Sequence, residues 1–178
     1  MGQYYNATFK KQSDKKWSSV TSWKFGWIGS KLMEHSYVNN PFVVFVKDKI
    51  FNNPMQVVWA GDYADPEQGH RKLNLFQLAA KARVPKKWCP ANSFGNMRYL
   101  YNVTKNVFID YSKVKKDKYG YRIDPLPLLT AEGNGRGGGD YNGTNMKRIG
   151  SWARDLICVT KDIPQGAKEL VINFKEKR

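Results

Sequence analysis

The sequence has 178 residues, of which 41% are hydrophobic and 14% aromatic; this length suits one domain, and this apolar content excludes general disorder. Its 30 Lys and Arg residues outnumber 15 Asp and Glu residues, which gives a formal net charge of +15. Such a positive field favours an anionic partner and excludes an acidic, DNA-mimicking protein.

The first third of the chain predicts two strands, a helix and a third strand. Residues 3–9 alternate loosely and predict a strand, and the aromatic, Ser/Thr-rich residues 17–28 predict a second strand or hairpin. Asn40 and the proline after it suit a helix start, and apolar residues at helical spacing then predict a short helix over 41–51, although its β-branched content favours a strand. The apolar residues 55–60 predict a buried strand.

The middle of the chain predicts a helix, a hairpin and an extended segment. Four apolar side chains share one helical face within residues 70–82, which makes this segment the most strongly predicted helix. Residues 98–103 and 107–112 flank a short turn and predict a β-hairpin. Two prolines indicate that residues 123–129 are extended rather than helical.

The last part of the chain predicts two closing strands, over residues 152–160 and 169–174, with Pro164-Gln165-Gly166 as the turn between them. The total is about two helices and six or more strands, with no repeat and no long linker. The sequence therefore predicts an α+β fold, mostly antiparallel sheet, as a single compact domain over residues 1–178.

A glycine-rich loop over residues 132–145 is the most unusual segment. Glycine takes positive φ freely and leaves its backbone N–H groups open, so the loop can surround a phosphate. It lacks the Gly-Lys-Ser/Thr ending of a P-loop, and a long mobile hairpin loop fits the same residues. The candidate phosphate contacts are Gly135, Arg136, Gly137, Gly138 and Gly139.

Basic and aromatic residues are interspersed over residues 81–122, which contain eleven Lys and Arg but only two carboxylates. Aromatic rings can stack on bases while Lys and Arg hold phosphates, so this stretch predicts a nucleic-acid contact. Tyr99 and Tyr101 share one face of their strand, and that face can equally be core. The predicted contacts are Lys86, Lys87, Arg98, Lys113, Lys115, Lys116 and Lys118, together with Arg136 of the loop.

Catalytic and metal chemistry have weak support. Asp62 and Asp65 follow an apolar strand, where carboxylates can act as bases but more often form turns and caps. His35 adjoins a glutamate, but no third group completes a catalytic set. Cys89 and Cys158 form no CxxC motif or Cys/His cluster. We therefore assign no catalytic residue and expect neither a metal nor a cofactor.

The chain has no stretch of 18 apolar residues and no apolar run at its start. We therefore expect a cytoplasmic protein without a membrane partner. The sequence leaves the oligomeric state open.

Several strings together resemble one family. They are residues 2–5, residues 31–37, residues 57–65 with the string WAGDYAD, and residues 125–155, which include GNGRGGGDY. They resemble a family of small proteins from phages and mobile elements of gut and other Gram-positive bacteria. The resemblance implies a phage-type accessory protein, of which anti-CRISPR proteins are one kind, and it brings no catalytic residue.

Charge and resemblance together predict a non-enzymatic inhibitor of host defence. A basic inhibitor of a CRISPR–Cas effector would compete for guide RNA, for target DNA or for an acidic face of the effector. Two alternatives remain: a nucleotide-binding protein or sponge that uses the glycine-rich loop, and an enzyme that acts on nucleotides or nucleic acid.

Overall fold

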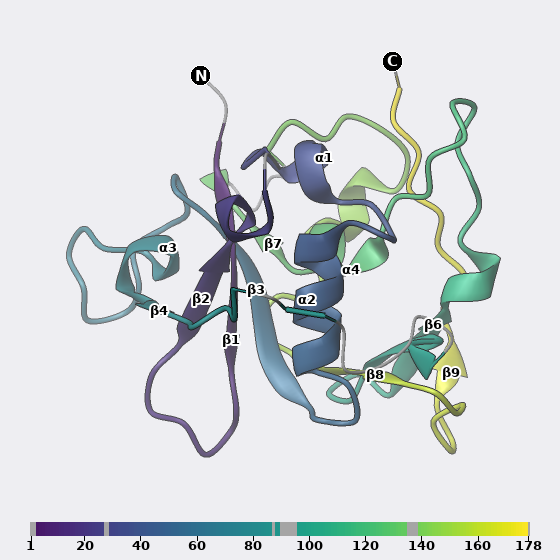
Figure 1. Cartoon of the computed structure of the whole chain (residues 1–178), viewed down its shortest axis with the longest axis horizontal. Helices are drawn as coiled ribbons and strands as arrows, with labels where there is room; N and C mark the ends of the chain where they lie inside the picture. Colours follow the sequence, from purple (N-terminus) through teal and green to yellow (C-terminus); the bar gives the residue numbers. More distant parts are fainter. Residues whose placement is uncertain (1–2, 27–28, 87, 90–95, 135–138, 178) are drawn as a thin grey trace.

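The computed structural model describes residues 3–26, 29–86, 88–89, 96–134 and 139–177. These residues form one mixed, mostly antiparallel sheet of nine strands, with the helices packed around it (Figure 1). The strands are β1 (Tyr5–Lys10), β2 (Ser18–Thr21), β3 (Met55–Gly61), β4 (Ala80–Lys81), β5 (Tyr99–Asn102), β6 (Val107–Asp110), β7 (Ala131–Glu132), β8 (Leu156–Thr160) and β9 (Lys168–Glu169). The predicted α+β fold with a dominant antiparallel sheet is confirmed.

The order of strands across the sheet is β4-β2-β1-β3-β8-β5-β6-β9, and β7 pairs with β3 off this path. Three pairs are parallel, β2 with β4, β3 with β7 and β6 with β9, and each of them involves a two-residue strand. The long central strands β1 and β3 are antiparallel, with Ala7 opposite Trp59. Both of these residues are fully buried, so the core lies against the middle of the sheet.

Four α-helices occur in the described residues: α1 (Leu32–His35), α2 (Pro41–Lys49), α3 (Leu75–Leu78) and α4 (Pro125–Leu129). The described residues also form three short 3-10 helices: η1 (Ser22–Phe25), η3 (Tyr111–Lys113) and η5 (Met146–Arg148). None of the described helices is long and apolar enough to cross a membrane.

The helix predicted over residues 41–51 is confirmed as α2. Its cap is Asn40, whose side-chain oxygen accepts a hydrogen bond from the N–H of Phe42 at 3.0 Å, and Pro41 occupies the first turn. Phe42, Phe45 and Val46 are buried against the sheet, so packing outweighs the β-branched content of the segment. Figure 1 shows α2 at the centre of the molecule beside β3.

The long helix predicted over residues 70–82 is wrong: only the single turn α3 forms. Asn74 and Gln77 make a capping box that starts the helix. The backbone becomes extended at Ala79, and the next residues pair with β2 as β4, with the N–H of Ala82 donating to Ser19 O at 2.7 Å. The edge of the sheet therefore takes the backbone hydrogen bonds that a longer helix would need.

The extended segment predicted over residues 123–129 is also wrong, because α4 forms there. Both prolines lie in its first turn, where the backbone N–H groups have no partner within the helix and a missing donor costs nothing. The carboxylate of Asp124 caps the helix by accepting from the N–H of Leu126 at 3.0 Å.

The remaining strands are confirmed in part. The predicted hairpin is β5 and β6, and Gly166 takes a positive φ of 73° in the predicted turn before β9. The closing strands are shorter than predicted, since β8 begins at Leu156 and β9 ends at Glu169. Beyond β9 the chain pairs with the end of the glycine-rich loop instead, where the N–H of Thr144 donates to Lys175 O at 2.9 Å.

Candidate nucleic-acid interface

The basic stretch that is continuous in sequence is divided in space. Lys86 follows β4, at one edge of the sheet, whereas Lys113 forms an ion pair with Glu169 of β9, at the other edge (Figure 1). The predicted contacts therefore do not form one surface. Two of them, Lys87 and Arg136, lie outside the described residues.

The basic residues near β6 and β9 are partly neutralised. Arg98 lies 3.7 Å from a carboxylate oxygen of Asp110, and Lys113 donates to Glu169 at 2.7 Å, a hydrogen bond that raises the pKa of Lys113. Lys115 and Lys116 are exposed. The amine of Lys118 lies 4.9 Å from the ring centre of Tyr119.

The described part of the glycine-rich loop packs against the start of β1. Gly139 has φ of +58°, and a Cβ atom there would lie 2.8 Å from the ring of Tyr5. A Cβ at Gly133 would lie 2.6 Å from the hydroxyl of Tyr5. These two glycines are therefore required by close packing. Gly135, Gly137 and Gly138, predicted to surround a phosphate, lie outside the described residues.

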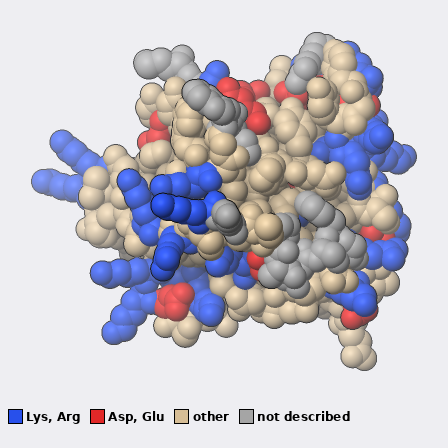
Figure 2. All heavy atoms as spheres, in the orientation of Figure 1, with Lys and Arg blue, Asp and Glu red and all other residues tan. Residues whose placement is uncertain are grey.

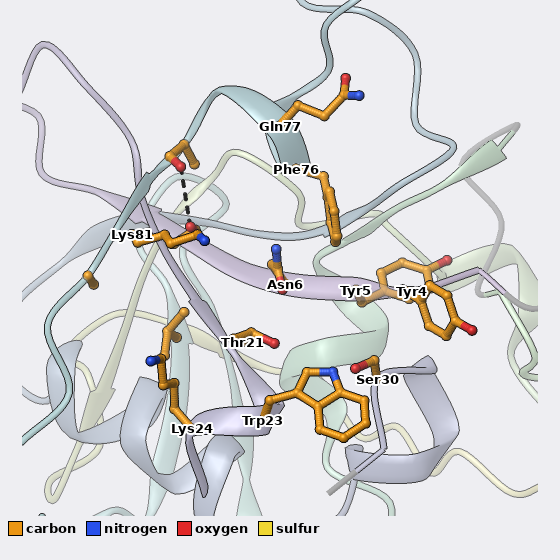
Figure 3. A pocket seen from close by; sticks show the side chains of 14 residues that line it. Tyr4, Tyr5, Asn6, Thr21, Trp23, Lys24, Ser30, Phe76, Gln77 and Lys81 are labelled. Atoms are coloured by element: carbon orange, nitrogen blue, oxygen red, sulfur yellow. Dashed lines mark hydrogen bonds between the residues drawn. The ribbon is translucent and has the colours of Figure 1, made fainter. Parts of the chain in front are cut away.

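A hollow of about 640 Å³ opens on the outer side of β1, β2 and β4. Figure 3 shows Phe76 of α3 and Trp23 of η1 on opposite sides of it. Tyr4 closes one end, and Lys24 and Lys81 lie at the other end. Aromatic rings therefore line three sides of the hollow, and two ammonium groups lie at the fourth.

The rings lie on elements with well-defined anchors. Trp23 lies in η1, the 3-10 helix that follows β2, and is 62% exposed. Tyr4 is 50% exposed, and its backbone N–H and carbonyl both bond to Asp62, at 3.1 and 3.0 Å. Exposed aromatic rings on an ordered backbone are available to a ligand at low entropic cost.

Asp62 and its neighbours have a structural role here. The carboxylate of Asp62 holds the backbone of Tyr4, and the carbonyls of Asp62 and Ala64 accept hydrogen bonds from the side-chain amide of Asn74, at 2.9 and 3.1 Å. Asn74 is the cap of α3, so this turn fixes the helix that carries Phe76. These contacts agree with the interpretation, favoured from the sequence, that Asp62 and Asp65 belong to a turn.

A second hollow, of about 430 Å³, adjoins the first. Phe25 and Trp88 line it, with ring centres 5.9 Å apart and planes at 89°. Lys24 lines both hollows, and Lys86 lines the second. We call the surface formed by the two hollows the aromatic–basic face.

The charge on the aromatic–basic face is uncompensated. No Asp or Glu lines either hollow, and Lys24, Lys81 and Lys86 form no ion pair with any residue that the structure describes. Figure 2 shows Lys and Arg gathered along the side of the molecule that carries β4 and α3, with isolated Asp and Glu among them. A phosphate would therefore meet unpaired cations here.

His35 is held in the core by two hydrogen bonds. The indole N–H of Trp59 donates to Nε2 of His35 at 2.9 Å, so Nδ1 carries the proton and donates to Gly29 O at 3.0 Å. Burial lowers the pKa of His35 to about 4 and raises that of the Cys158 thiol to about 11. Within the described residues, no cluster of His, Cys, Asp and Glu suits a metal ion.

Sequence reasoning identified only Lys86 among the lysines of this face. Tyr4, Trp23 and the segment that carries both Phe76 and Lys81 are far apart in the chain, and the pairing of β1 with β2 and of β2 with β4 brings them together. The sequence gives one indication of these residues, the aromatic, Ser/Thr-rich stretch over 17–28, in which Trp23 follows strand β2. No protein-family model matches the sequence, and no curated protein or solved structure is significantly similar to it.

Proposed function

We propose that the protein binds nucleic acid, free or within a nucleoprotein complex, through the aromatic–basic face. The observation that carries the proposal is the first hollow, where the exposed rings of Tyr4 and Trp23 and the partly buried ring of Phe76 meet two lysines and no carboxylate. If these rings served only to fill the core, they would be buried. Trp23 and Tyr4 are instead at least half exposed to solvent.

Both parts of a nucleic-acid contact are present on this face. Stacking a base on an aromatic side chain contributes about 1–3 kcal/mol, and any base can stack. Each Lys that neutralises a phosphate releases counterions, which makes affinity depend steeply on salt. The net charge of +15 adds a long-range attraction that speeds encounter with a polyanion.

The biological role that we propose is that of a phage-type accessory protein in the bacterial cytoplasm, which inhibits a host defence such as a CRISPR–Cas effector without catalysis. Its basic surface suits competition for guide RNA or target DNA. A nucleotide sponge is the alternative, because the volume of the first hollow, about 640 Å³, also suits a single nucleotide.

The test compares two double charge reversals that lower the net charge equally. Lys24→Glu with Lys81→Glu alters the aromatic–basic face, and Lys115→Glu with Lys116→Glu, at the other edge of the sheet, is the matched control. We expect the first pair to weaken binding of labelled RNA and DNA about tenfold or more, and to flatten the slope of log affinity against log salt by about 1.4. The measurement is fluorescence anisotropy across a salt series.

The control pair should keep nearly the native slope. Equal losses in the two pairs would mean that net charge alone governs binding, and a loss confined to Lys115 and Lys116 would place the interface near β9. Either result contradicts the proposal.

A further inference from the structure

The two hollows of the aromatic–basic face lie side by side. Lys24 lines both of them, so this residue lies between the two hollows. Lys81 lies in the first hollow and Lys86 in the second. The face therefore has two aromatic compartments with one cation between them and one further cation in each.

The two compartments differ in how tightly their rings are packed. Trp88 packs against Phe45, with ring centres 5.3 Å apart, and meets the edge of Phe25, so its ring is fixed as a wall of the second hollow. Pro41 and Pro85 restrict the backbone on other sides of it. In the first hollow, by contrast, most of the ring of Trp23 is exposed.

An aromatic ring that lines a hollow stacks best on a flat ligand group, such as a base, whose own face is not covered. In a duplex both faces of a base are covered by its neighbours, and only the base edges and the phosphates are accessible. In a single strand the bases can separate and stack on protein rings while Lys and Arg follow the backbone. The ring surfaces lining both hollows would make no contact with the bases of an intact duplex.

We infer that the ligand of the aromatic–basic face is single-stranded nucleic acid, with one unpaired base in each hollow and the phosphate between them on Lys24. This inference rests on the proposed function. The first hollow also has the polar side chains Asn6 and Thr21, which can bond to the edge of a base there (Figure 3). The smallest ligand that uses both hollows is a dinucleotide.

The experiment measures affinity by fluorescence anisotropy or calorimetry, for a single strand of about 12 nucleotides, for its duplex, and for a mononucleotide and a dinucleotide. We expect the single strand to bind about tenfold or more tightly than the duplex in about 150 mM salt. We expect the dinucleotide to bind more tightly than the mononucleotide, because only the dinucleotide can place a base in each hollow while its bridging phosphate meets Lys24.

Trp23→Ala tests stacking directly. We expect it to weaken single-strand binding about 5- to 150-fold and to leave duplex binding unchanged, and Trp23→Phe should restore part of the loss. Trp23 is 62% exposed, so the melting temperature of both variants should equal that of the native protein. Tyr121→Ala, which removes a ring that is 52% exposed next to the lysines of the other edge, is the matched control.

The outcomes separate this inference from the proposed function. Equal affinity for single strand and duplex overturns the inference and leaves nucleic-acid binding standing. Equal affinity for the mononucleotide and the longer strands also overturns it, in favour of the nucleotide sponge. Absence of binding to all four ligands overturns both.

Discussion

Acidification is expected to destabilise the protein through His35. The side chain is fully buried, and its neutral form satisfies both ring nitrogens, one by accepting from Trp59 and the other by donating to Gly29. Protonating Nε2 would place two donors face to face and would leave a charge in an apolar environment. Burial accordingly lowers the pKa of His35 to about 4.

The size and sign of the effect follow from this pKa. An unfolded chain binds a proton at His35 below about pH 6.5, whereas the folded protein does so only near pH 4. The unfolded state therefore holds more protons in this window, and the free energy of unfolding falls as pH falls from about 6.5 to about 4. A pKa difference of about 2.5 corresponds to about 3 kcal/mol.

The assay is urea unfolding at several pH values between about 7 and 4, for the native protein and for His35→Gln. Glutamine does not titrate, and its amide oxygen can accept from Trp59. Ionisation of the carboxylates contributes equally to both proteins and cancels in the difference. We expect the native protein to lose about 3 kcal/mol more than the variant over this range. Identical pH dependence in the two proteins would refute the reasoning.

Two further predictions concern stability. Lys47→Met should lower the free energy of unfolding by about 3–5 kcal/mol, because the buried carboxylate of Asp124 would lose the ammonium group 2.9 Å away; adding Asp124→Asn should recover part of the loss in urea unfolding. Gly139→Ala should lower the melting temperature more than Gly69→Ala does. Both glycines have positive φ, but only a Cβ at Gly139 meets Tyr5, and equal losses would contradict the packing argument.

Local signals in the sequence predicted the elements whose contacts are local. The cap of α2 and the hairpin of β5 and β6 depend on residues within a few positions, and both form as predicted. The segment over 70–82 has a helical apolar face but lies at the edge of the sheet, where pairing with β2 replaces the last turns. The prolines of α4 wrongly indicate an extended segment, because a proline is compatible with the first turn of a helix but not with its later turns.

The candidate interface was harder to predict, because it is assembled from three segments of the chain, the third of which comprises α3 and the adjoining β4. Tyr4 precedes β1, Trp23 follows β2, Phe76 lies on α3 and Lys81 on β4. Charge density along the sequence indicated residues 81–122, but Lys105 and Lys113 of that stretch pair with carboxylates that come from elsewhere in the chain. Only the folded structure shows which lysines remain unpaired, because their partners are distant in the linear sequence.

The most direct test of the central claim is photochemical crosslinking of a thiouridine-containing single strand to the native protein, followed by mapping of tryptic peptides. We predict crosslinks to the peptides of residues 17–24 and 73–81, which contain Trp23 and Phe76. Crosslinks confined to residues 119–122, beside the lysines at the other edge of the sheet, would contradict the account.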